Sequence, residues 1–295
     1  MGLDWNGLRF LAEARKSGVS FERTITLGRQ NQYVSAHQVQ EIFDRVGLPL
    51  TSTGDPNGYS ELILRELGAG IVDSADNSDF EGATIVADLN RPFPDELFET
   101  YDAVFDGGTM EHVFNFPQAL RNAMSLPKLG GTLFIHTMMN NWAGHGFYQF
   151  SPELFHRSLN AENGYRVVRM LAHPHYVDAP RYECPDPEQL RGRLEVASSW
   201  DGLMLYVEAR REAIVPIFNK TPQQSDYAAR WQGAEVQNQE PSLKQKLAAG
   251  AKRMPGAVSA KRRLASAFPA VVRAANAKAH RRERKGFAVE RLKRI

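Results

Sequence analysis

Apolar residues follow two alternating patterns along this chain, and the alternation predicts the order of strands and helices. Short runs rich in β-branched and aromatic residues predict strands at residues 21–28, 71–76, 84–90, 101–108, 132–139, 164–174 and 201–211. Apolar residues at helical spacing predict helices at residues 8–16, 35–47, 59–70, 116–131 and 151–159. Strands that alternate with helices in this way are typical of α/β proteins.

The predicted fold is a Rossmann-like, doubly wound sheet of seven mostly parallel strands with helices on both faces. The last two strands have no obvious helix between them, so we expect an antiparallel pair at the sheet edge. The composition changes after residue 215. We therefore expect a domain at residues 1–215, a linker at 216–242 and a basic, partly helical or disordered tail at 243–295.

The composition is that of an ordinary globular protein, with 42% hydrophobic and 10% aromatic residues. Cys184 is the only cysteine in the sequence, which excludes an internal disulfide and a zinc site built from several cysteines. No apolar stretch has the length of a signal-peptide core or of a membrane-spanning helix. These features predict a cytoplasmic protein.

Charge is distributed unevenly along the chain. Residues 243–295 contain 16 Lys and Arg and 2 acidic residues, a net charge of +14, although the whole chain has a net charge of only +2. Apolar residues among these basic ones favour contact with an anionic surface such as the inner face of the cell membrane. Nucleic acid is a weaker candidate because the tail offers few aromatic side chains for base stacking. A solvated extension without a partner is the alternative.

Polar and small residues gather where the predicted strands end, which is the edge at which open α/β sheets bind ligands. A buried strand leads into residues 106–109, Asp-Gly-Gly-Thr, and Glu111 and His112 follow directly. We favour a ligand site here, although a tight turn and a local helix cap would use the same residue types.

A second dense stretch lies at residues 140–155, where His145 is flanked by glycines and surrounded by aromatic residues. The unperturbed pKa of a histidine suits a general base. Asn140, Asn141 and Tyr148 would suit a polar, hydroxyl-rich acceptor. An aromatic cluster that only supports the loop is the alternative.

The remaining histidines give little indication of function. His173 and His175 lie near Glu183 and Cys184, but their spacing matches no standard set of zinc ligands. We therefore predict no metal site from the sequence.

The order of segments from residue 21 to residue 211 resembles a class I S-adenosylmethionine-dependent methyltransferase, especially the methyltransferase-11 type. The resemblance covers about two-thirds of the chain. It is carried by three motifs: YDAVFDGGTMEHV at residues 101–113, FPQALRNAMSL at 116–126 and LGGTLFIHT at 129–137.

The resemblance implies S-adenosylmethionine as the cofactor. The implied cofactor contacts are Gly28, Arg29, Asp73, Asp76, Asp88, Leu89, Asp106, Gly107 and Gly108. Asp76, or Asp73 if the strand ends earlier, would accept the ribose hydroxyls, and Asp88 and Leu89 would lie beside the adenine. The implied catalytic residues on the substrate side are Glu111, His112 and His145.

The sequence departs from the family in the loop after its first strand, where Gln30 and Gln32 replace the second and third glycines. Either the cofactor is held in an altered way, with Arg29 near its carboxylate, or the domain is a non-catalytic binding or scaffolding protein. The missing Gly-x-Gly-x-x-Gly counts against a dinucleotide or nucleotide-sugar enzyme. We expect methyl transfer to an oxygen or nitrogen of a small or saccharide-like acceptor.

Overall fold

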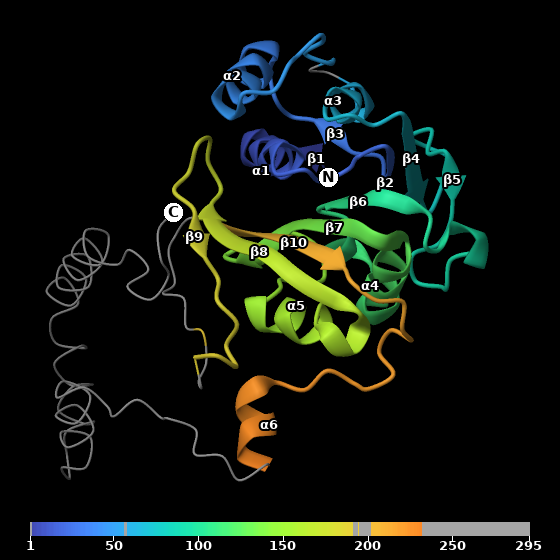
Figure 1. The fold of residues 1–295 in the computed structure, drawn as a ribbon, viewed down its shortest axis with the longest axis vertical. Helices are drawn as coiled ribbons and strands as arrows, with labels where there is room; N and C mark the ends of the chain where they lie inside the picture. Colours follow the sequence, from blue (N-terminus) through green and yellow to red (C-terminus); the bar gives the residue numbers. More distant parts are fainter. Residues whose placement is uncertain (1, 56–57, 191–193, 195–201, 232–295) are drawn as a thin grey trace, which may run out of the picture.

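The computed structural model describes residues 2–55, 58–190, 194 and 202–231. The predictions for the basic tail at 243–295 therefore lie outside the described residues. Within these ranges the protein is a mixed α/β structure with one large central sheet (Figure 1). None of the described helices combines the length and the apolar character needed to cross a membrane.

The central sheet has the order β5-β4-β2-β6-β7-β10-β8-β9 among the described residues. Its parallel strands are β2 (Arg23–Leu27), β4 (Ile71–Asp76), β5 (Ile85–Val86), β6 (Tyr101–Gly107) and β7 (Pro127–Asn140). Its antiparallel edge consists of β10 (Leu203–Arg211), β8 (Tyr165–Pro174) and β9 (Tyr182–Glu183). The antiparallel edge is confirmed, but the prediction of seven strands is wrong because β9 adds an eighth.

The chain winds in two directions from the middle of the sheet. It runs outward from β2 to β4 and β5, and then returns to the other side of β2 to form β6 and β7. The strand order therefore reverses between β2 and β6, and such a switch point leaves a crevice at the carboxyl ends of the two strands.

Helices cover both faces of the sheet (Figure 1). One face carries α1 (Trp5–Lys16), α2 (Ala36–Val46) and α3 (Glu61–Glu66), and the other carries α4 (Phe116–Ser125) and α5 (Pro152–Ser158). Alternate residues of the central strands supply the two cores, so that Phe105 packs toward α1 and Val104 packs toward α4.

Local sequence explains where several elements begin and end. Ser35 and Gln38 form a capping box at the start of α2, and Gly47 ends this helix in a left-handed conformation with φ of 73°. The strand predicted at residues 84–90 is shorter, because the backbone N–H of Asn90 bonds to the Asp88 carboxylate and turns the chain.

The remaining short elements support this frame. They are β1 (Gly2–Leu3) and β3 (Asn31–Gln32), which form a small parallel sheet, the 3₁₀ turns η1 (Asp95–Leu97), η2 (Met110–His112) and η3 (Ala161–Asn163), and α6 (Ser225–Trp231). The chain after β10 remains packed on the domain: Ile217 is buried in the core, and the Ser225 N–H donates to the Glu153 carboxylate at 2.7 Å. These contacts lie inside the segment predicted as a linker.

Candidate functional site

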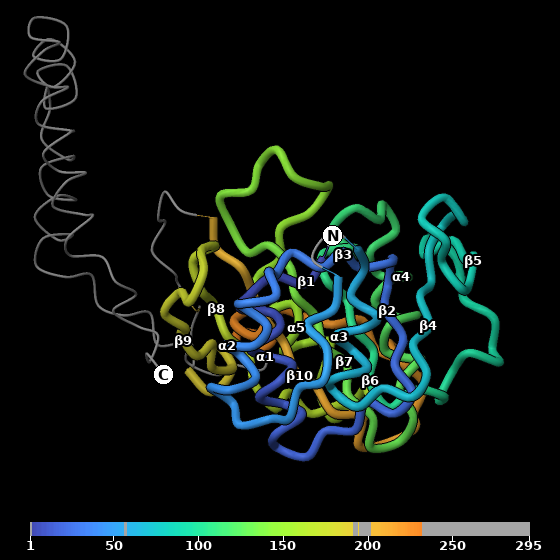
Figure 2. The backbone as a smooth tube through the Cα atoms, turned by 90° about the horizontal axis from the view of Figure 1, so that it is seen from above, coloured from blue at the N-terminus to red at the C-terminus, as the bar shows by residue number. Residues whose placement is uncertain are grey.

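The carboxyl ends of the parallel strands lie along one edge of the sheet. In Figure 2 the green loops after β6 and β7 and the cyan loop after β4 stand along the upper edge. Of the residues that the sequence assigned to cofactor or acceptor, all except Asp73 lie at or after the carboxyl end of a parallel strand. The topology therefore brings predicted residues of five strands to one edge of the sheet.

Gln30 lies at the switch point, between the carboxyl ends of β2 and β6. Its side-chain amide donates to the Leu27 carbonyl at 2.5 Å and to the Thr109 hydroxyl at 3.1 Å, so it connects the ends of β2 and β6. A Cβ atom placed on Gly107 would lie only 2.4 Å from Gln30 Oε1. The Gln30 side chain therefore fills the space beside Gly107.

The two predicted residues before Gln30 are held inside the fold. Gly28 has φ of 70°, and its N–H donates to the Ala75 carbonyl at 2.7 Å. The Arg29 guanidinium pairs with Glu61 at 2.6 Å and lies 3.9 Å from the Tyr59 ring centroid. Arg29 therefore links the end of β2 to α3 and to the loop that precedes this helix.

The structure separates Asp73 from Asp76. Asp76 is the last residue of β4, and its half-buried carboxylate accepts the backbone N–H of Asn77 at 2.7 Å. Asp73 lies in the middle of the same strand and accepts the Tyr101 hydroxyl at 3.0 Å. Burial, and then the Asp73 charge, raise the pKa of Tyr101 above its usual value.

Asp88 and Leu89 follow β5 but face different surroundings. The Leu89 side chain is buried in the core, whereas the Asp88 carboxylate bonds to the side chain and backbone N–H of Asn90 at 2.9 Å. These hydrogen bonds lower the pKa of Asp88 and keep it ionised.

Asp106 is fully buried at the end of β6. Its Oδ1 accepts the N–H groups of Thr109 at 3.0 Å and Met110 at 3.2 Å, while its Oδ2 has no hydrogen-bond partner among the described residues. Burial, and then the neighbouring Glu111 charge, raise the pKa of Asp106 well above its usual value. Asp106 therefore stabilises the turn at Gly107 and Gly108 by accepting the N–H groups that follow it.

Glu111 is a second buried carboxyl group, in η2. Its Oε2 accepts the Thr137 hydroxyl of β7 at 3.2 Å, and its Oε1 finds no partner within the described part of the chain. Gly108, at φ of 90°, leaves room for this side chain, since a Cβ there would lie 3.2 Å from Glu111 Oε1. Burial raises the pKa of Glu111 to about 7.

His112 and His145 come together although 33 residues separate them. Their Nε2 atoms lie 3.2 Å apart, and their ring centroids are 4.8 Å apart. Burial lowers the pKa of both imidazoles, and the neighbouring His145 adds to the effect on His112. Both rings are therefore neutral at pH 7, and at least one Nε2 presents a lone pair.

The predicted acceptor residues surround the loop that carries His145. Asn140 ends β7, and its buried Oδ1 lacks a hydrogen-bond partner among the residues described. Asn141 has φ of 61°, a conformation that asparagine tolerates better than most residues. The Tyr148 hydroxyl donates to the Phe114 carbonyl at 2.7 Å, and its ring stacks on Phe150.

Within the described residues, one group of His, Cys, Asp and Glu side chains converges closely enough to share an ion, and it consists of Glu111, His112 and His145. The sequence did not bring these three residues together, because no local spacing connects the loop after β6 with the loop after β7. His173 and Cys184, which lie near each other in the sequence, are not part of this group. His173 is buried in the central sheet, and burial raises the pKa of the Cys184 thiol to about 12.

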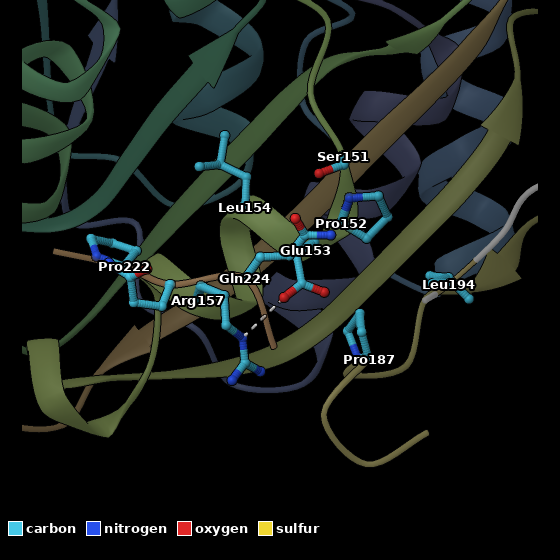
Figure 3. A pocket seen from close by; sticks show the side chains of 10 residues that line it. Ser151, Pro152, Glu153, Leu154, Arg157, Pro187, Leu194, Pro222 and Gln224 are labelled. Atoms are coloured by element: carbon cyan, nitrogen blue, oxygen red, sulfur yellow. Dashed lines mark ion pairs between the residues drawn. The ribbon is translucent and has the colours of Figure 1, made fainter. Parts of the chain in front are cut away.

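A pocket of about 390 Å³ opens beside the first turn of α5 (Figure 3). Glu153 and Arg157 form an ion pair in its wall, with Pro187, Leu194 and Pro222 around them. None of the residues that line this pocket was predicted as a site residue. The sequence signal at the strand ends and the pocket beside α5 therefore mark different places.

Neither a protein-family model nor a curated protein matches the sequence. Solved structures with a similar arrangement include an S-adenosylmethionine-dependent methyltransferase from Mesorhizobium loti, with 16% identity, 70% of this chain and 100% of that chain covered, and a TM-score of 0.38. A putative methyltransferase from Bacillus halodurans has 12% identity, 72% and 100% coverage and a TM-score of 0.40. The [4+2]-cyclase SpnF has 14% identity, 69% and 79% coverage and a TM-score of 0.38.

Two of these three structures are methyltransferases and one is a cyclase. The class of fold rests on the strand order and winding of this chain itself, since identities and TM-scores of this size carry no argument about activity.

Proposed function

We propose that the protein is an S-adenosylmethionine-dependent methyltransferase that acts on an oxygen or nitrogen of a small or saccharide-like acceptor. The observation that carries the proposal is the row of carboxylates and glycines along the carboxyl edge of the sheet. It runs from Asp76 at the end of β4, across the switch point, to Gly107 and Gly108 at the end of β6. The sequence resemblance over residues 101–137 supports it.

The strand ends beyond β4 and β5 fit the adenosine half of such a cofactor. The Asp76 carboxylate is half-buried at a strand end, and a carboxylate can accept two hydroxyl donors at once. Asp88 and Leu89 follow β5, the next strand in the sheet, and so offer a neighbouring surface. We propose that Asp76 accepts the ribose hydroxyls, as the resemblance implies.

The methionine half fits only after one side chain has moved. Gln30 fills the space beside Gly107, and its Oε1 is buried without a hydrogen-bond partner in the described part of the chain. An unpaired buried amide oxygen is costly, so the closed position of Gln30 gains little from that end of the side chain. We propose that Gln30 swings away from Gly107 when the cofactor binds.

The acceptor would lie against Glu111, His112 and His145, across Gly108 from the proposed cofactor position. The cofactor, when bound, supplies an electrophilic methyl group. The chain contributes mainly by holding the acceptor close and aligned, which alone can account for a large part of a methyl-transfer rate. The exposed rings of Phe114 and Phe147, 5.9 Å apart, offer an apolar contact at the rim of this surface.

Calorimetry with S-adenosylhomocysteine tests the proposal, using the wild type, Asp76→Ala and Gly108→Trp. We expect micromolar binding by the wild type, roughly −8 kcal/mol, about 100-fold weaker binding by Asp76→Ala and no measurable binding by Gly108→Trp. Gly108→Trp should act by steric exclusion, since Gly108 has φ of 90° and faces Glu111. No heat from a folded, monodisperse wild type would contradict the proposal and favour a non-catalytic binding protein.

A further inference from the structure

Three metal-ligating side chains meet on the acceptor side of the site. One oxygen of Glu111 and one nitrogen each of His112 and His145 lie within 4.8 Å of one another. Glu111 is buried, whereas His112 is exposed and His145 is half-buried. The group therefore combines one buried carboxylate with two imidazoles that solvent can reach.

Backbone contacts hold the two loops together at this point. The N–H groups of Phe147 and Tyr148 donate to the Glu111 carbonyl at 2.8 and 3.2 Å. Gly146 has φ of 71°, and a Cβ there would lie 2.9 Å from the Glu111 carbonyl oxygen. Only glycine allows the loop to approach this closely, so the position of His145 is built into the backbone.

The spacing of the two imidazoles matches that of two ligands of one ion. Metal–nitrogen bonds of about 2.0–2.1 Å would turn the observed Nε2–Nε2 separation of 3.2 Å into an angle of roughly 100°, close to tetrahedral. Ligands of a tetrahedral ion at these bond lengths lie about 3.3 Å apart. The three ligating atoms lie within 4.8 Å of one another, so ligation would draw the Glu111 oxygen in by up to about 1.5 Å.

A hydrogen bond between the two imidazoles would explain the 3.2 Å separation but not the state of Glu111. The buried Glu111 Oε1 has no hydrogen-bond partner among the described residues, and such an oxygen is costly when ionised. A bound cation would satisfy the Glu111 carboxylate and one nitrogen of each imidazole together. We propose that Glu111, His112 and His145 bind one divalent transition-metal ion.

The donor set selects the class of ion. Two imidazoles and one carboxylate suit Zn²⁺ and Fe²⁺, whereas Mg²⁺ and Ca²⁺ prefer sites made only of oxygen. Three protein ligands leave coordination positions open, and the exposure of His112 places these positions toward the acceptor side. An oxygen or nitrogen of a small molecule is the ligand that would complete the site.

Metal ligation and the predicted role of His145 as a proton acceptor exclude each other, because a ligated Nε2 has no free lone pair. The metal site itself does not depend on the proposed methyl transfer. Only its use for positioning an acceptor rests on that function.

The test is Zn²⁺ calorimetry on the full-length chain after dialysis against a chelator, without cofactor or acceptor. We expect one Zn²⁺ per chain at this site and no comparable response to Mg²⁺. His145→Ala and Glu111→Gln should each weaken Zn²⁺ binding at least tenfold, because each removes or weakens one of three ligands. Co²⁺ in place of Zn²⁺ should give visible absorption that is lost in His145→Ala.

His37→Ala is the matched control, since His37 is an exposed histidine on α2, away from the acceptor side. It should leave Zn²⁺ affinity unchanged. Absence of Zn²⁺ binding by the folded wild type would overturn the proposal. Equal Zn²⁺ affinity in His145→Ala and the wild type would overturn it as well. The Zn²⁺ titration contains no cofactor. If the chain failed to bind S-adenosylhomocysteine in a separate titration, that result would contradict the proposed methyl transfer but not the metal site.

Discussion

The cofactor side and the acceptor side of the same sheet edge differ in how far their side chains are already engaged with the rest of the fold. On the cofactor side, Arg29 is paired with Glu61, and Gln30 connects β2 to β6 through its amide. Buried oxygens without a hydrogen-bond partner among the described residues occur on both sides, at Gln30 and Asp106 as well as at Glu111 and Asn140. The acceptor side differs because the His112 and His145 imidazoles lie 3.2 Å apart and reach solvent. On the cofactor side Gln30 fills the space beside Gly107, whereas the acceptor side presents ligating nitrogens to solvent.

A position at a strand end therefore indicates ligand binding less well than the contacts that the side chain already makes within the fold. Arg29 and Asp76 are both at strand ends, yet Arg29 is committed to the fold and Asp76 retains a half-buried carboxylate. Buried atoms without partners are uncommon in folded proteins, so each one needs a physical explanation. Three variants separate the two sides experimentally, and a fourth concerns an unpaired buried atom that lies on neither side.

The largest expected effect is on the cofactor side. Asp76→Ala should weaken S-adenosylhomocysteine binding about 100-fold, because it removes an acceptor for two hydroxyl groups and hydrogen bonds to a charged group contribute about 1.5–3 kcal/mol each. Asp73→Asn is the matched control, because Asp73 bonds to Tyr101 in mid-strand. Titration calorimetry should show nearly wild-type affinity for this control. Equal losses in both variants would mean that Asp76 has no special role.

On the acceptor side, Gly146→Ala should weaken Zn²⁺ binding about tenfold. The new Cβ would lie 2.9 Å from the Glu111 carbonyl oxygen at a positive φ, so the loop must move and carry His145 away from His112. At Gly144, two residues earlier, a Cβ would meet nothing within 4 Å. Gly144→Ala should therefore bind Zn²⁺ as the wild type does, and a similar loss in both variants would contradict the fixed loop geometry.

His136 tests whether every unpaired buried atom indicates binding. Its Nε2 also lacks a hydrogen-bond partner within the described structure, but its ring is enclosed and stacks 3.9 Å from Tyr206. Burial, and then the His173 charge, lower the pKa of His136 well below 6.5, so the folded state keeps it neutral. The unfolded chain binds a proton below about pH 6.5, so stability is complete above that pH and falls as the pH decreases.

The expected contribution of His136 is about 1.4 kcal/mol of unfolding free energy lost between pH 7.5 and 5.5. His136→Phe keeps an aromatic ring without a titratable group. Urea unfolding at the two pH values should show a correspondingly smaller loss in this variant. An unchanged pH dependence would mean that the folded state already tolerates the protonated imidazole.

The smallest expected effect concerns Gln30, at the carboxyl ends of β2 and β6. Gln30→Ala removes the side chain that fills the space beside Gly107, so S-adenosylhomocysteine binding should become about fivefold tighter, roughly 1 kcal/mol. Calorimetry on this variant and the wild type measures the change directly. Weaker binding would show that the bridge from Gln30 to Thr109 supports the cofactor site instead of obstructing it.

Much of the fold was predictable because hydrophobic period and capping residues are local signals. The bounds of β4 match the prediction at residues 71–76, and α2 at Ala36–Val46 matches the helix predicted at residues 35–47. The eighth strand was missed because Tyr182–Glu183 is too short to show a pattern. The Glu111 and His112 motif was recognised, but a contact with His145 across 33 residues depends on the tertiary fold.

A crystal structure of the full chain soaked with Zn²⁺ and S-adenosylhomocysteine would test both proposed sites together. We expect an anomalous zinc peak between Glu111, His112 and His145. We also expect S-adenosylhomocysteine density with its ribose at Asp76 and its amino-acid end beside Gly107, with Gln30 displaced. S-adenosylhomocysteine density elsewhere, or none with Gln30 still against Gly107, would contradict the cofactor side. Zinc bound only at other residues would contradict the acceptor side.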